Sequence, residues 1–116
     1  MACLTANAQA EQVEINWEAD GRFGYEALLD GEAMAEVCGP LNESDVVQWS
    51  LKSATPVDFN IHYHQGDEVV YPARINGTRE LGDRLNITLT QTYCWMLTNP
   101  KQSPTVIGLD LQLNPH

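Results

Sequence analysis

The sequence predicts an all-β fold, an antiparallel β-sandwich of about eight short strands. Apolar and polar residues alternate over short runs along the chain, which is the period of a strand with one buried face. Turn-forming pairs that contain Gly or Pro separate these runs at short spacing, and no ten-residue window keeps a helical period. A chain of 116 residues can build a single core, so we expect one domain over residues 11–116. A closed barrel is the alternative arrangement of the same strands.

The first half of the chain contains four predicted strands, at residues 13–17, 22–29, 32–38 and 47–51. The turns between them fall at Asp20-Gly21, Asp30-Gly31 and Gly39-Pro40. Asp30-Gly31 is a strong signal for a two-residue hairpin. We therefore expect the strands on either side of it to pair with each other.

The second half continues with predicted strands at residues 57–64, 68–75, 85–90 and 93–98, and a last strand that ends at Leu113. The breaks fall at Thr55-Pro56, Gly66-Asp67, Asn76-Gly77 and Asn99-Pro100. In the strand at 57–64 the apolar residues Val57, Phe59 and Ile61 alternate with polar ones, so we expect them to face the core. Trp49 and Phe59 are predicted to be large core side chains.

Charge restricts the classes of partner. The chain has 6 Lys and Arg against 16 Asp and Glu, a formal net charge of -10, which repels nucleic-acid phosphates and anionic membrane surfaces. No apolar run approaches the roughly 20 residues that span a bilayer. The acidic residues are spread along the chain, which is typical of a well-solvated surface, and a cationic partner or metal ion is the alternative.

The first ten residues indicate export. Residues 1–10 are small and nearly uncharged, and they end in Ala8-Gln9-Ala10, the pattern that precedes a signal-peptidase cut. We interpret them as a residual signal-sequence tail or disordered leader, with a lipid anchor at Cys3 as a further expectation and an ordinary frayed terminus as the alternative. The expected location is the periplasm, the lumen of the secretory pathway or the extracellular space.

Three cysteines fit one disulfide and one remaining thiol. Cys38 and Cys94 each lie in a strand-like segment, whereas Cys3 lies in the leader, so we predict a Cys38–Cys94 disulfide. Three glycosylation sequons begin at Asn42, Asn76 and Asn86. They would be used only in a eukaryotic secretory pathway.

Two pairs of side chains suggest a metal site. His62 and His64 lie two residues apart on the polar side of their strand, and Cys94 and Met96 repeat this spacing on a later strand. The two pairs share one face if the two strands belong to the same sheet. Imidazole with sulfur suits copper. The alternative is a set of solvated surface histidines with Met96 packed under a loop, and a disulfide would remove Cys94 from the ligands.

Part of the chain resembles the Golgi-dynamics (GOLD) domain over about 70 residues. The motifs that carry the resemblance are Trp49, the segment Val57-Asp58-Phe59-Asn60-Ile61, Gly66, Val70-Tyr71, and Tyr93 with Asn99. Cys38 and Cys94 fall in the segments where lumenal members of that family carry cysteines, although Cys94 follows Tyr93 directly. The resemblance implies a jelly-roll-like β-sandwich that binds a partner without catalysis.

A second resemblance is to the first motif of the cupins. His62, His64 and Glu68 have the spacing with which that family binds a metal inside a barrel. The second cupin motif, a Pro-x-Gly turn followed by a His, is absent from the corresponding region, where Trp95 stands near the His position. The resemblance implies a metalloenzyme with an incomplete ligand set.

The sequence therefore favours an exported, non-catalytic binding module, and a protein is the expected partner. The segments typical of serine hydrolases, phosphate-binding loops and CxxC oxidoreductases are missing. Trp17, Trp49, Tyr71 and Trp95 are candidate anchors for a partner, although aromatic residues at alternating positions are more often in the core. The alternatives are a periplasmic copper or other transition-metal binder and, third, a cupin-type enzyme.

Overall fold

The computed structural model describes residues 10–115, and this part of the chain is built from strands without a helix. Its seven strands confirm the predicted all-β fold class. Their bounds are β1 (Ala10–Glu14), β2 (Arg22–Leu29), β3 (Met34–Leu41), β4 (Val46–Gln65), β5 (Glu68–Asn86), β6 (Gln91–Thr98) and β7 (Thr105–Leu113). None of the described residues belongs to a helix long and apolar enough to cross a membrane.

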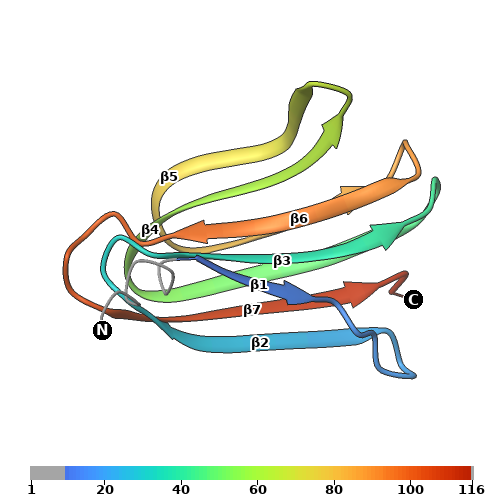
Figure 1. Cartoon of the computed structure of the whole chain (residues 1–116). Helices are drawn as coiled ribbons and strands as arrows, with labels where there is room; N and C mark the ends of the chain where they lie inside the picture. The colour runs from blue at the N-terminus through green and yellow to red at the C-terminus, as the bar shows by residue number, and fades with distance from the viewer. Residues whose placement is uncertain (1–9, 116) are drawn as a thin grey trace, which may run out of the picture.

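The strands form one curled sheet that folds over into two layers (Figure 1). The first layer has the order β1, β3, β6 and the C-terminal half of β4. The second has the order β2, β7 and the N-terminal half of β4. β5 follows β4 along the folded end, so β1 and β2 form the open edge. β1 and β3 run parallel and every other pair is antiparallel, which makes the sheet mixed.

β4 passes from one layer to the other without ending at Thr55-Pro56, so the predicted break at this pair is wrong. Residues 47–53 pair with β7, and residues 58–62 pair with β6. The register with β5 shifts between Lys52 and Val57. Pro56 lies in this interval, where a missing N–H donor is tolerated because the ladder is already interrupted. The proline therefore marks a bend within one strand.

β5 also continues where a turn is predicted, at Asn76-Gly77. The register moves from Val57–Thr78 to Phe59–Ile75, so β5 has one extra residue here, which is a β-bulge. Gly77 has a φ of 74°, a conformation that glycine adopts without cost. The predicted strand at 85–90 is only the end of β5, because strand structure stops at Asn86.

The predicted hairpin at Asp30-Gly31 is also wrong. β2 pairs with β7 and β3 pairs with β6, so this turn connects the two layers. The buried side chain of Asn99 explains the difference: its amide donates to the carbonyl oxygens of Leu29 (3.3 Å), Asp30 (3.2 Å) and Ser103 (2.8 Å). Asn99 Oδ1 accepts from the backbone N–H of Lys101 (3.1 Å). One side chain thus holds the ends of two connections together.

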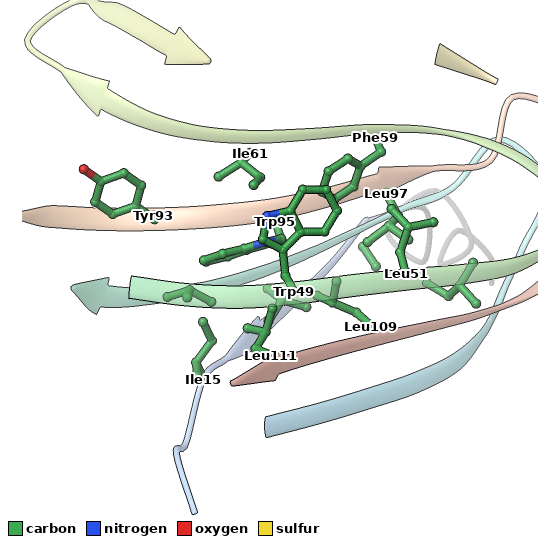
Figure 2. Close-up of a cluster of buried hydrophobic side chains, with 14 of the residues drawn as sticks. Ile15, Trp49, Leu51, Phe59, Ile61, Tyr93, Trp95, Leu97, Leu109 and Leu111 are labelled. Atoms are coloured by element: carbon green, nitrogen blue, oxygen red, sulfur yellow. The ribbon is translucent and has the colours of Figure 1, made fainter. Parts of the chain in front are cut away.

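The core fills the space between the layers (Figure 2). The rings of Trp49 and Phe59 lie 4.9 Å apart between centroids and join the two halves of β4. Trp49 is 4 % exposed and Phe59 1 %, which confirms the core assignment of both. Val57 and Ile61 are fully buried, as the alternation predicts. The hairpin between β4 and β5 is confirmed too, with His64 opposite Val69.

Candidate functional site

The polar side of the histidine-bearing strand is the outer face of the first layer. His62 stands opposite Cys94, and Asn60 stands opposite Met96 in the neighbouring strand β6. The predicted condition that both strands share a sheet is therefore met. The next strand, β3, adds Glu36 opposite Met96 and Cys38 opposite Cys94. These side chains come from separate parts of the sequence and meet only through the register of three strands.

His62 is buried on this outer face, with 5 % of its surface exposed, so the expectation of a solvated surface histidine is wrong for this residue. Its Nε2 lies 2.9 Å from Oε2 of Glu36, and its Nδ1 lies 2.7 Å from Oδ1 of Asn60. The rings of His64 and Tyr71 lie 5.4 Å and 5.9 Å away between centroids. The side chains of Glu36, Asn60, His64 and Tyr71 lie around the His62 ring on this face.

Burial lowers the pKa of His62 below the usual 6.5, since the cost of desolvating the charged ring exceeds the attraction of Glu36. A neutral ring has one donor and one acceptor. The neutral His62 ring forms hydrogen bonds with both neighbours when its Nε2–H donates to Glu36 and its Nδ1 accepts from Asn60. The second bond requires the Asn60 side-chain amide to be flipped by 180°, so that its NH₂ group faces Nδ1. Gln12 Nε2 donates to the other carboxylate oxygen of Glu36 at 3.0 Å, which extends the chain of hydrogen bonds to β1.

Cys38 and Cys94 form the predicted disulfide, which spans 56 residues of sequence. With its sulfur bonded to Cys38, Cys94 is not available as a thiolate ligand in the oxidised protein. On the chain-entropy model such a bridge stabilises the fold by about 4 kcal/mol. Cys3 and the proposed leader through Gln9 lie outside the described residues.

The other predicted metal ligands are arranged differently. His64 is exposed next to His62, and Met96 is partly buried on the same face. Glu68, which the cupin motif requires as a ligand, is exposed beside the hairpin turn. Both histidines point away from the core, so a cupin arrangement with imidazoles inside a barrel is not formed. Glu36 was not among the predicted ligands, because only the register of β3, β6 and β4 brings it to His62.

The candidate aromatic anchors separate into two groups. Trp49 and Trp95 are buried in the core, and within the described structure the Trp95 indole N–H has no hydrogen-bond partner. Tyr71 is 41 % exposed, and the Arg74 guanidinium lies 4.5 Å above its ring. Trp17 is partly buried. Tyr71 and Trp17 are therefore the two of these residues that a partner can reach.

The open edge of the sandwich is acidic. Residues 11–45 contain ten acidic side chains and one arginine, a formal charge of −9. Five of these acids follow β1, β2 and the loop between them, and we call this set the acidic edge: Glu11, Glu14, Glu18, Asp20 and Glu26. All five are exposed. By contrast, β5 at the folded end carries three arginines and three acids, so its charge is balanced.

A side-chain hydrogen bond joins β1 and β2 at the acidic edge. Tyr25 on β2 donates its hydroxyl to Oε1 of Glu11 on β1 at 2.6 Å. Burial, this hydrogen bond and the negative charge of Glu11 all raise the pKa of Tyr25, so the hydroxyl keeps its proton. Phe23 and Tyr25 on β2 and Trp17 in the preceding loop are partly buried along the same edge. The edge thus combines charge with aromatic surface.

Comparison with known proteins finds likeness in structure only. No known protein family and no curated protein sequence matches the chain. Among solved structures it is similar to PliG of Aeromonas hydrophila, a periplasmic inhibitor of g-type lysozyme, with a TM-score of 0.72, 9 % identity, and 90 % of this chain and 97 % of that chain covered. It is also similar to the pre-peptidase C-terminal domain of a Bacillus anthracis collagenase, with a TM-score of 0.63, 11 % identity and coverage of 89 % and 94 %.

A third similar structure is CorA of Methylomicrobium album BG8, a surface-associated copper-binding protein, with a TM-score of 0.51, 6 % identity and coverage of 88 % and 96 %. At these identities the likeness establishes the fold alone. The sandwich-like fold agrees with what the GOLD resemblance implies. Membership of the GOLD or cupin families stays a prediction.

Proposed function

We propose that the protein is an exported, non-catalytic binding module whose partner is a positively charged protein, bound at the acidic edge. The observation that carries this proposal is the concentration of charge, because nine of the ten net negative charges fall within residues 11–45. A surface of one sign raises the association rate of a partner of the opposite sign and disfavours like-charged competitors.

The aromatic residues of the acidic edge support direct contact with a partner, in addition to long-range electrostatic attraction. Interfaces are enriched in aromatic side chains, are surrounded by a polar rim, and draw most of their binding energy from a few residues, among which Trp and Tyr are common. Trp17, Phe23 and Tyr25 are partly exposed among the five acids. A partner that covers them would bury apolar surface while its cationic residues meet the carboxylates.

The structural neighbours supply a candidate partner. PliG of Aeromonas hydrophila is an inhibitor of g-type lysozyme and acts in the periplasm. Export of the present chain is supported by its disulfide, which persists in oxidising compartments. A g-type lysozyme is therefore the first protein to test as a partner.

The test is calorimetric titration of the protein with a g-type lysozyme and, separately, with cytochrome c as an unrelated cationic protein. We expect specific binding to the lysozyme that weakens as salt rises, because salt screens charges at the rim. The acidic-edge variant carries the substitutions Glu14→Gln, Glu18→Gln and Glu26→Gln. Its matched control removes three acids from β5 through Glu68→Gln, Glu80→Gln and Asp83→Asn.

The two variants have the same net charge, so a difference between their affinities reports where the removed charges lie and not how many were removed. We expect the acidic-edge variant to bind at least about tenfold more weakly and the β5 variant to change by less than about threefold. Equal losses in both variants would reject the acidic edge as the binding surface. Failure to bind the lysozyme while binding cytochrome c would keep a cationic partner and exclude that lysozyme.

A second candidate function is transition-metal binding at His62 and His64, with Met96 as a sulfur ligand and copper as the metal. The proximity of the two imidazole rings, 5.4 Å between centroids, favours it. CorA, a copper-binding protein of similar fold, supports the choice of metal. Titration of the oxidised protein with Cu(II) should give one equivalent bound. The double variant His62→Ala, His64→Ala should lose that binding, and its retention would point to scattered carboxylates instead.

A further inference from the structure

We propose that reduction of the Cys38–Cys94 disulfide creates a four-ligand site for a thiophilic metal ion on the outer face of the first layer, and that Zn²⁺ is the ion it fits best. The ligands are Cys38, Cys94, His62 and Glu36. This site is independent of the acidic edge. It also differs from the copper candidate, which uses His64 and Met96 and requires no reduction.

The ligand atoms are already gathered in the oxidised protein. One oxygen of Glu36, one ring nitrogen of His62 and the sulfur of Cys94 all lie within 4.8 Å of one another. Ligand atoms around a tetrahedral Zn²⁺ are about 3.3–3.8 Å apart, as follows from metal–ligand bonds of about 2.0–2.3 Å. Small side-chain adjustments therefore bring these three atoms into coordinating positions. The fourth ligand, Cys38, is bonded to Cys94 before reduction and stays adjacent to it afterwards.

Strand pairing positions the four residues in addition to the disulfide. Cys38 pairs with Cys94 between β3 and β6, and Cys94 pairs with His62 between β6 and β4. Glu36 is two residues before Cys38 on the same face of β3. Three neighbouring strands thus supply the ligands at adjacent positions of one ladder, which is the rigid support that a metal site requires.

A reductant can reach the disulfide from one side. Cys38 lines a surface hollow of about 400 Å³, together with Gln12, Glu14, Pro40 and Thr92. Cys94 is 7 % exposed and lies next to His62, away from solvent. The accessible sulfur is therefore that of Cys38, and attack on it releases Cys94 as the leaving thiolate.

The reaction needs a dithiol as the reductant. One thiolate of the dithiol attacks the Cys38 sulfur, the Cys38–Cys94 bond breaks, and a mixed disulfide forms while Cys94 departs as a thiolate beside the His62 ring. The second thiol of the dithiol then attacks the mixed disulfide and releases Cys38. The dithiol ends as a disulfide, and the two cysteines gain two electrons and two protons. Zn²⁺ binding then displaces both thiol protons to solvent.

The ligand set selects the metal. Two thiolates, one imidazole and one carboxylate are all ordinary Zn²⁺ ligands, and a tetrahedral arrangement suits an ion without geometric preference. Cu(I) also favours thiolate and imidazole, but it gains little from a hard carboxylate oxygen. Involvement of Glu36 therefore separates the two ions.

The experiment compares oxidised protein with protein reduced by dithiothreitol and desalted without oxygen, both with Cys3→Ser so that the leader contributes no thiol. Zn²⁺ affinity is measured by competition with a chromophoric chelator, and Co²⁺ serves as a spectroscopic substitute that reports thiolate coordination. Cu(I) is titrated in parallel. The variants are His62→Ala and Glu36→Gln, with His64→Ala and Glu80→Gln, an exposed acid on β5, as matched controls.

We expect the reduced protein to bind one equivalent of Zn²⁺ at least about 100-fold more tightly than the oxidised protein, with a thiolate-to-cobalt charge-transfer band. His62→Ala and Glu36→Gln should each weaken Zn²⁺ binding by about tenfold or more, while the two controls leave it unchanged. Equal affinity in both redox states, absence of the cobalt band, or losses as large in His64→Ala would overturn the proposal. Cu(I) binding that is insensitive to Glu36→Gln and tighter than Zn²⁺ binding would overturn the choice of metal.

Two further measurements test the site even if the protein unfolds when its disulfide is reduced. If the reduced protein unfolds, Zn²⁺ must restore its native circular dichroism, because metal and fold are then coupled. Failure to restore it contradicts the proposal. The variant Cys38→Ser leaves Cys94 free without any reductant and should bind Zn²⁺ through three protein ligands more weakly than the reduced parent. A complete loss of binding in a folded Cys38→Ser protein would also contradict the site.

Discussion

Asn99 offers the sharpest test of what holds the two layers in register. Its two amide N–H groups serve three backbone carbonyls, so one N–H is shared between two of them, and its oxygen accepts one backbone N–H. Asn99→Ala therefore removes the equivalent of three hydrogen bonds at a fully buried position. Each is worth about 1 kcal/mol net, and groups left without a partner add to the cost unless water reaches them. We expect the free energy of unfolding to fall by about 4 kcal/mol.

Urea denaturation followed by tryptophan fluorescence and circular dichroism measures this loss. Asn16→Ala, at an exposed position in the loop after β1, is the control and should change stability by less than about 0.5 kcal/mol. Asn99→Asp keeps the acceptor for Lys101 but turns a carboxylate oxygen towards three carbonyl oxygens, so it should be at least as damaging as Asn99→Ala. A loss below about 1 kcal/mol for Asn99→Ala would refute the assignment of Asn99 as the residue that joins the connections.

Three further predictions concern the core, the buried histidine and the disulfide. Trp49→Ala or Phe59→Ala should lower the free energy of unfolding by about 3–5 kcal/mol in urea melts, and a loss below about 1 kcal/mol would contradict their packing. Burial lowers the pKa of His62 below 6.5, so the histidine of the unfolded chain takes up a proton at a higher pH than that of the folded protein. The contribution of His62 to the free energy of unfolding is therefore fully present above pH 6.5 and is lost as the pH falls below 6.5 towards the pKa of the folded state. His62→Gln should flatten that slope in melts across pH, and an unchanged slope would exclude His62 as its source. Peptide mapping of oxidised protein should recover Cys38 linked to Cys94, and reduction should lower stability by about 4 kcal/mol; two free thiols in the map would reject the bridge.

Local patterns predicted the strands better than their partners. Alternation placed Val57, Phe59 and Ile61 inside correctly, since the period of a strand depends only on neighbours in sequence. The hairpin predicted at Asp30-Gly31 is wrong because turn residues favour a hairpin but do not determine which strand pairs with which. Asn99, which is distant in sequence, binds this turn through the carbonyl of Asp30.

The candidate site shows the same limit. Alternation predicted that His62, Cys94 and Met96 lie on polar strand faces, and the structure places them on one outer face. It could not predict Glu36 or the burial of His62, because both depend on β3 and β4 lying on either side of β6. The register between strands far apart in sequence is set by the packing of the whole core, which no local window contains.

The passage of β4 and β5 through both layers has a consequence for the order of folding. These two strands are joined by a short turn and pair along their length, so their hairpin closes a small loop and can form early. β2 pairs with β7 from the opposite end of the chain, so this contact closes a long loop and should form late. Pulsed hydrogen exchange during refolding should protect amides of β4 before those of β2. The open edge is then the last part of the molecule to be completed, and the first to open in the native state.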